Sequence, residues 1–186
     1  MAAVDDDEQV RLLRLRTLAD LRADVALIDI PIGLAASGPR TCDLEARRLL
    51  GRPRASSVFP APTRALLAQV SPRCSRQLFN ILAKIREADE LAPGVCGWFE
   101  GHPEVSFALM SGGRGLAEPK RTPAGRAHRL SLLRRAFTQL PARLDDDEAD
   151  AYALLWSARR LAASQELRLP AERVLDARGL AMQIVA

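Results

Sequence analysis

Two short apolar segments constrain the fold of this chain more than any other feature of its 186 residues. The segment 25–30 is apolar on both faces until Asp29, and Pro31 ends it. The segment 95–100 is also largely apolar and ends at an acidic residue, Glu100. Strands that are apolar on both faces are typical of a parallel sheet that helices cover on each side. We therefore expect an α/β protein whose sheet contains these two segments.

Periodicity and capping residues predict the elements around these two strands. The strand 9–16 and a short helix capped by Thr17 precede the strand 25–30, which is the order of a βαβ unit. Further along the chain we expect a helix that ends at Gly51 and a helix that begins after Ser75. Later helices and a terminal strand are predicted over 123–140, 146–164 and 182–185.

Composition limits the class of protein. The length suits one domain over residues 1–186, and 48% hydrophobic residues are enough for a sizeable core. Three cysteines and two histidines, without a CxxC pair, argue against a zinc site or a disulfide framework. The start of the chain is acidic, and the most apolar run is shorter than the ~20 residues of a membrane helix. We expect a soluble, cytoplasmic protein without a membrane partner.

Three acidic residues occupy positions at which a functional role explains a carboxylate better than the overall composition does. Asp29 and Glu100 occupy the carboxyl ends of the two apolar strands, the edge at which open α/β sheets bind ligands. If the strands are neighbours, these carboxylates approach each other and need a cation or a proton between them. Asp150 lies past the first turn of the helix 146–164, at the edge of its apolar stripe, so it is expected to be partly buried.

A cluster of Asp29, Glu100 and Asp150 suits one or two Mg²⁺ or Mn²⁺ ions, because these metals take carboxylate oxygens and complete their shell with water and substrate phosphates. Such ions activate a water for phosphoryl displacement. The simpler interpretation also stays open: an acid at a strand end often forms a turn, and an acid at a helix start often caps it.

Basic residues near these acids suggest a phosphate-bearing partner, since the formal net charge is +4 and arginine binds phosphate well. Arg40 and Arg47 belong to a cluster that follows Asp29, while Lys120 and Arg126 flank a later turn. His102 lies between two glutamates and is a further candidate for substrate contact or, equally, a loop residue bonded to backbone. Only 4% of residues are aromatic, which argues against a dedicated single-strand binder.

Several motifs in a fixed order resemble a bacterial family of proteins of unknown function, DUF429. They are Ile28-Asp-Ile-Pro-Ile-Gly-Leu34, Arg40-x-Cys-Asp43, Glu100-x-His-Pro-Glu104, Lys120-x-Thr122 and Asp147-x-x-Asp-Ala151. The resemblance implies a ribonuclease H-like mixed sheet flanked by helices and a Mg²⁺-dependent nuclease. Carried over to this chain, it implies metal ligands and catalytic acids at Asp29, Glu100 and Asp150, with Asp147 as an additional ligand.

The family's usual opening strand, with its Asp-Gly and Gly-Trp, has no match in this sequence. The resemblance therefore implies an N-terminally truncated member with an unpaired sheet edge and little or no nuclease activity. Asp5, Asp6 and Asp7 are expected to form a hairpin turn instead. Our first expectation is a metal-dependent nuclease; the alternatives are a non-catalytic nucleic-acid-binding protein and a hydrolase of a small phosphorylated molecule.

Overall fold

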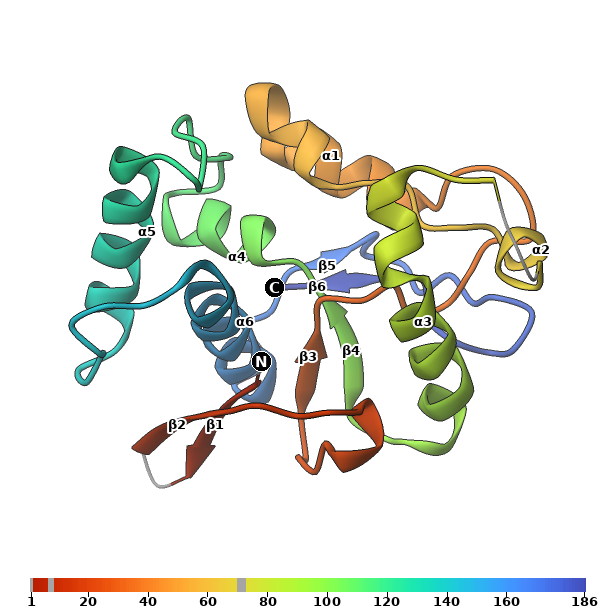
Figure 1. The fold of residues 1–186 in the computed structure, drawn as a ribbon, viewed down its shortest axis with the longest axis horizontal. Coiled ribbons are helices and arrows are strands. Elements are labelled where there is room, and N and C mark those ends of the chain that lie inside the picture. The colour runs from red at the N-terminus through yellow and green to blue at the C-terminus, as the bar shows by residue number, and fades with distance from the viewer. Residues whose placement is uncertain (1, 7–8, 70–72) are drawn as a thin grey trace.

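The computed structural model describes residues 2–6, 9–69 and 73–186, and it confirms the expected α/β class. A mixed four-stranded sheet lies between helices (Figure 1). The strand order is β3 (Ala26–Ile28), β4 (Trp98–Gly101), β6 (Ile184–Val185) and β5 (Arg168–Leu169). The strands β3, β4 and β6 run parallel, whereas β5 is antiparallel to β6.

The described residues form six α-helices and three short 3-10 helices. The α-helices are α1 (Thr41–Arg54), α2 (Arg64–Leu67), α3 (Arg76–Leu91), α4 (Pro103–Met110), α5 (Pro123–Ala136) and α6 (Asp146–Ala162). The 3-10 helices are η1 (Leu18–Asp20), η2 (Ala55–Ser57) and η3 (Ala92–Gly94). No helix in these described parts is both long and apolar enough to span a bilayer.

The predicted helix starts and breaks are confirmed. The side-chain oxygens of Thr17 and Ser75 accept hydrogen bonds from the first turns of η1 and α3. Asp145 and Glu148 form a reciprocal capping box at the start of α6, which satisfies backbone donors that a helix end leaves free. Gly51 interrupts α1 with φ of 60°, a conformation that favours glycine.

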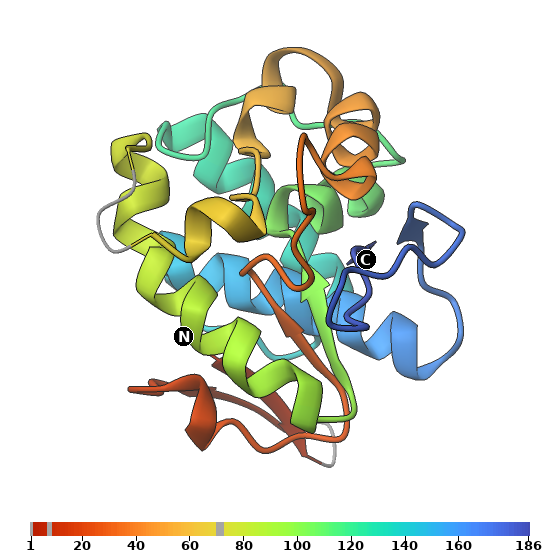
Figure 2. The ribbon, with the colours of Figure 1, turned by 90° about the vertical axis from the view of Figure 1, so that its right-hand side faces the viewer.

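Helices cover the two faces of the sheet differently. Ile28 packs with Leu82 and Ile85 of α3 in one core cluster. On the other face, a Cβ at Gly101 would touch Leu154 of α6 and Leu27 of β3. Figure 2 shows this layering, with α3 in front of the strands and α6 behind them. Side chains that alternate along β3 therefore point either to α3 or to α6.

The N-terminal segment is not part of the main sheet. β1 (Ala2–Asp6) and β2 (Gln9–Leu13) form a separate antiparallel pair, and β1 packs against α6. The predicted βαβ unit over 9–30 is therefore wrong, because β2 and β3 belong to different sheets. Asp5 and Asp6 lie in β1 rather than in a turn, and Asp7 lies outside the described residues.

Two other boundaries differ from the sequence-based expectation. The predicted helix over 123–140 ends at Ala136, where Phe137 adopts an extended conformation and packs against Tyr152 of α6. The residues after His102, for which no helix was predicted, form α4. Pro103 occupies the first turn of that helix, a position that proline tolerates because the N–H there has no partner within the helix.

Candidate functional site

Asp29 and Asp150 face the same cavity. Asp29 follows the last residue of β3, and Asp150 lies in the second turn of α6. The cavity has a volume of about 570 Å³ and runs along the outer edge of β3 and the side of α6. Exposed Asp147, one turn before Asp150, also lines it. Three of the four predicted metal ligands thus surround one cavity.

Glu100 lies on the opposite face of the sheet. The strands β3 and β4 are neighbours, as expected, but Ile28 rather than Asp29 is the register partner of Glu100. Register partners point to the same face and the next residue points to the other. Glu100 therefore points toward the α1 and α3 side, whereas Asp29 points toward α6. The expected approach of these two carboxylates is not found.

Arg40 satisfies Glu100 instead. The two terminal nitrogens of Arg40 each donate to one oxygen of Glu100 at 2.7 Å, and the backbone N–H of Ile32 donates to the same carboxylate at 2.8 Å. Arg40 also pairs with Asp43 at 2.6 Å. Both Arg40 and Glu100 are buried, at 3% and 6% exposure. Neither is available to bind substrate, so this network fixes the start of α1 against β4.

Burial governs the electrostatics of this network. It acts to lower the pKa of Arg40, but the ion pairs with Glu100 and Asp43 outweigh it and raise that pKa well above its ordinary value. Burial also raises the pKa of Glu100, and Arg40 opposes this effect. The bidentate pair is a structural feature that connects the sheet to α1.

Lys120 neutralises Asp150 in the cavity wall. The ammonium Nζ of Lys120 donates to Oδ2 of Asp150 at 3.0 Å, and the Asp150 side chain is only 19% exposed. Burial raises the pKa of Asp150 to about 6; Lys120 opposes the shift, while Asp29 and Glu104 add to it. Burial acts to lower the pKa of Lys120, but the acidic neighbours, chiefly Asp150, raise it by more. The pKa of Lys120 is therefore above its ordinary value.

The carboxylate of Asp29 also holds its proton more tightly than usual. Asp29 is exposed along the cavity, and desolvation by the protein around it raises its pKa. The charges of His102 and Lys120 oppose the shift. Asp29, Asp150, His102 and Lys120 therefore form one electrostatically coupled group.

Glu104 belongs to the same group, although it was not among the predicted site residues. It lies in the first turn of α4 and is only 7% exposed. Its Oε1 accepts a hydrogen bond from Arg129 at 2.6 Å, and its Oε2 is buried without a partner in the described parts of the chain. Nδ1 of His102 is likewise buried and unpartnered. A proline three residues after the strand-end acid Glu100 was the available signal for α4, which places Glu104 here.

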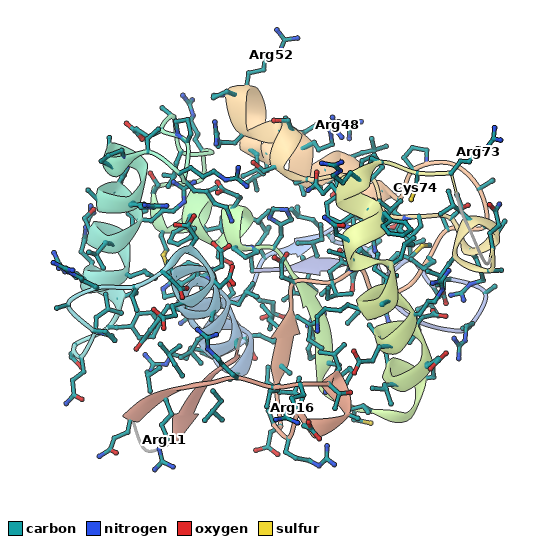
Figure 3. The ribbon with its side chains drawn as sticks, in the orientation of Figure 1. Arg11, Arg16, Arg48, Arg52, Arg73 and Cys74 are labelled. Atoms are coloured by element: carbon teal, nitrogen blue, oxygen red, sulfur yellow. The ribbon has the colours of Figure 1, made fainter. Side chains whose placement is uncertain are left out.

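The remaining predicted substrate contacts lie in different places. Arg47 on α1 donates to the carbonyl of Val58 at 3.2 Å. Other arginines of the α1 cluster point outward, as Arg48 and Arg52 do in Figure 3. Exposed Arg126 pairs with Asp146 at 3.0 Å, near Lys120 and Asp150. Lys120 and Arg126 thus lie close to the acidic cavity, whereas the α1 arginines form a separate surface.

No group of three or more His, Cys, Asp or Glu side chains in the described part of the chain is arranged to hold a metal ion. Magnesium is often bound by only one or two carboxylates together with water and substrate phosphates. The pair of Asp29 and Asp150 matches that smaller donor set. The unpartnered oxygen of Glu104 is a further hard donor close to it.

Comparisons with known proteins identify a family but no individual relative. Neither the curated proteins nor the solved structures gave a significant match. The family model described as "Protein of unknown function (DUF429)" matches residues 1–174, which is most of the chain. The motifs around Asp29, Glu104 and Asp150 lie within that span. The chain belongs to the DUF429 family.

Proposed function

We propose that this protein is a divalent-cation-dependent hydrolase that cleaves phosphodiester bonds in nucleic acid. One observation carries the proposal: Asp29 from the sheet and Asp150 from α6 share a cavity, and the pKa of each carboxyl is raised. Neighbouring carboxylates that hold protons too tightly gain stability from a bound cation. A ribonuclease H-like architecture, with acids contributed by a strand and a C-terminal helix, is part of this proposal.

Asp29 and Asp150 would hold the cation, with Asp147 at the rim of the same cavity. A bound Mg²⁺ or Mn²⁺ supplies charge stabilisation at the phosphate and an acidic water. Buried Glu104 adds negative charge next to Asp150 and has one unsatisfied oxygen. Glu100 is left out of the proposed ligand set, because Arg40 binds both of its oxygens.

Two basic residues beside the acids, Lys120 and His102, orient the phosphate. Nζ of Lys120 lies 3.0 Å from Oδ2 of Asp150 and the side chain is 40% exposed, so the ammonium can pair with a phosphate bound next to that carboxylate. The charge of His102 acts to lower the pKa of Asp29. Its buried Nδ1 has no hydrogen-bond partner among the described residues. These two groups bind the phosphate oxygens that carry charge and hold the ester next to the acids.

A hydrolase of a small phosphorylated molecule is the second candidate, and the cavity favours it. A volume of about 570 Å³ falls within the ~300–1,000 Å³ typical of small-ligand sites. The walls toward α6 are largely apolar, with Leu154, Leu155 and Ala158 among the lining residues. A nucleotide fits this description as well as a strand of nucleic acid does.

Manganese binding and cleavage together test the proposal. We expect Mn²⁺ to bind the wild-type protein, measured by electron paramagnetic resonance, and Asp150→Asn to weaken this binding at least tenfold. Glu90→Gln, an exposed carboxylate on α3, is the matched control and should bind Mn²⁺ as the wild type does. Slow Mn²⁺-dependent cleavage of a fluorogenic oligonucleotide, lost in Asp150→Asn, would support the nuclease.

Different outcomes separate the candidates. Cleavage of nucleotides without cleavage of oligonucleotides favours the small-molecule hydrolase. Nucleic-acid binding that weakens steeply with salt and ignores Mg²⁺, without cleavage, favours a non-catalytic binding protein. A wild-type protein that binds no Mn²⁺ at millimolar concentration contradicts the cation site itself.

A further inference from the structure

A second cavity adjoins the acidic one and has a different chemistry. It lies between α5 and the first two turns of α6, has a volume of about 250 Å³ and is lined by Lys120 and Asp150. Asp150 also lines the larger cavity, so one side chain borders both. We call this second cavity the α5–α6 pocket. A group bound there lies next to Lys120 and Asp150, where the proposed function places the phosphate that is cleaved.

The walls of the α5–α6 pocket combine apolar and cationic groups. Ala127, Leu130 and Leu144 provide apolar surface. Arg126 and Arg143 are exposed cations of the same lining. An apolar surface flanked by guanidinium groups suits a ligand with a flat, weakly polar body and a negative charge.

Arg129 gives the pocket a buried cation with a free donor. It is only 3% exposed, lines the pocket and donates to Glu104 at 2.6 Å. Its Nε is buried and has no hydrogen-bond partner within the described residues. Buried donors are rarely left unsatisfied, so Arg129 brings one unsatisfied donor to the wall that it helps to form.

The other cations are available for exchange. Arg126 pairs with Asp146, but its side chain is 60% exposed, and an exposed ion pair of this kind contributes about 1 kcal/mol or less. A phosphate competes with the carboxylate at small cost. Arg143 lies on the loop before α6 and is an exposed residue of the pocket lining.

We propose that the α5–α6 pocket binds a nucleoside monophosphate unit, the part of the substrate next to the bond that is hydrolysed beside Asp29 and Asp150. The choice of a nucleotide as the ligand rests on the proposed function. The existence and the lining of the pocket do not depend on it. The base lies on the wall of Ala127 and Leu130, and Arg126 and Arg143 approach its phosphate and its ring. Arginine thereby replaces the stacking aromatics that are scarce in this chain.

Adenosine 5′-monophosphate is the probe, titrated into isotope-labelled protein in EDTA and followed by NMR. We expect shifts in the amides of Ala127, Leu130 and Ala149, and weaker binding of adenosine and of inorganic phosphate. Ala127→Glu adds a negative side chain at an exposed position of the pocket and should weaken the binding at least tenfold. Ala124→Glu, exposed on the same helix and outside the pocket lining, should change it less than twofold.

Two results would overturn the inference: inorganic phosphate binding as tightly as the nucleotide, or nucleotide binding that Ala127→Glu leaves intact. Absence of any shift at millimolar nucleotide would overturn it as well. Because the titration contains no divalent cation, it is independent of catalysis. Nucleotide binding without cleavage or Mn²⁺ binding would contradict the proposed hydrolase alone, whereas cleavage without nucleotide binding would contradict the pocket alone.

Discussion

Lys120 and Asp150 form an ion pair of 3.0 Å at the boundary between the two cavities, and Asp150 nevertheless keeps a raised pKa of about 6. The ammonium lowers that pKa, but burial together with Asp29 and Glu104 raises it by more. The pair therefore does not fully compensate the carboxylate. An additional cation at this place would be favourable, and the folded protein tolerates the uncompensated charge at the expense of stability.

Stability should fall with pH because of Asp150. A carboxyl whose pKa is near 6 when folded and near 3.8 when unfolded keeps its proton longer in the folded state. Between about pH 4 and pH 6 the folded state therefore binds more protons, so its contribution to stability decreases as pH rises, by about 2–3 kcal/mol in all. With EDTA present to remove divalent cations, the free energy of unfolding of Asp150→Asn should lack the decrease between pH 4 and pH 6 that Asp150 causes in the wild type.

Urea unfolding at several pH values measures this effect. Asp147→Asn, an exposed residue of the same helix, is the control and should leave the wild-type pH dependence in place. An Asp150→Asn protein that loses stability between pH 4 and pH 6 as steeply as the wild type would show that Asp150 is not the responsible group.

Removal of Lys120 should raise the pKa of Asp150 above 6. Lys120 is the largest influence that lowers this pKa, and Lys120→Met keeps most of the side-chain volume while it removes the charge. The carboxyl carbon of Asp150, followed by NMR across pH, reports the pKa directly. A midpoint that stays at the wild-type pH in Lys120→Met would mean that the ion pair is absent in solution.

The sequence predicted the strands β2, β3, β4 and β6, the helix caps and the acidic residues at strand ends, because each of these signals is local. It did not predict which face each acid occupies. A shift of one residue in register moves a side chain to the other face of the sheet. Asp29 and Glu100 both follow apolar runs, but the pairing of Ile28 with Glu100 separates them. That pairing depends on the packing of the whole sheet.

Glu104 illustrates a second limit of local signals. Its burial depends on α4, whose eight residues place it opposite Arg129 of α5. Twenty-five positions separate the two residues in sequence. A short helix that begins at a proline gives little periodicity to detect. The position of Glu104 near Asp150 therefore becomes visible only when α4 and α5 are placed together.

Single removal of either partner in the buried Arg40–Glu100 pair should destabilise the fold strongly. Arg40→Met or Glu100→Gln leaves a buried group without its partner, at a cost of about 3–5 kcal/mol. The double variant Arg40→Met/Glu100→Gln should cost less than the two single changes added together, because it leaves no charge of this pair behind. Denaturant unfolding measures all three values.

The same variants test the role of Glu100. Mn²⁺ binding by Glu100→Gln, measured under conditions in which the variant is folded, should equal that of the wild type. Reduced Mn²⁺ binding with unchanged stability would return Glu100 to the cation site and contradict the structural role described above.

Gly97 controls how β3 approaches β4, and with it the position of Asp29. Its carbonyl accepts a hydrogen bond from the N–H of Ala26 at 2.8 Å, and a Cβ at this glycine would lie 2.1 Å from the carbonyl oxygen of Asp24. Its φ is +87°, which side chains rarely adopt. Gly97→Ala should therefore cost at least about 3 kcal/mol, from both strain and collision.

Gly113 separates these two causes. Its φ is +93°, close to that of Gly97, but nothing lies within 4 Å of the Cβ that alanine would add. Gly113→Ala should cost only the conformational part, about 1–2 kcal/mol. Equal losses in thermal or denaturant unfolding for the two variants would show that β3 moves aside at Gly97. The backbone on which Asp29 depends would then be less rigid than the contact with Asp24 implies.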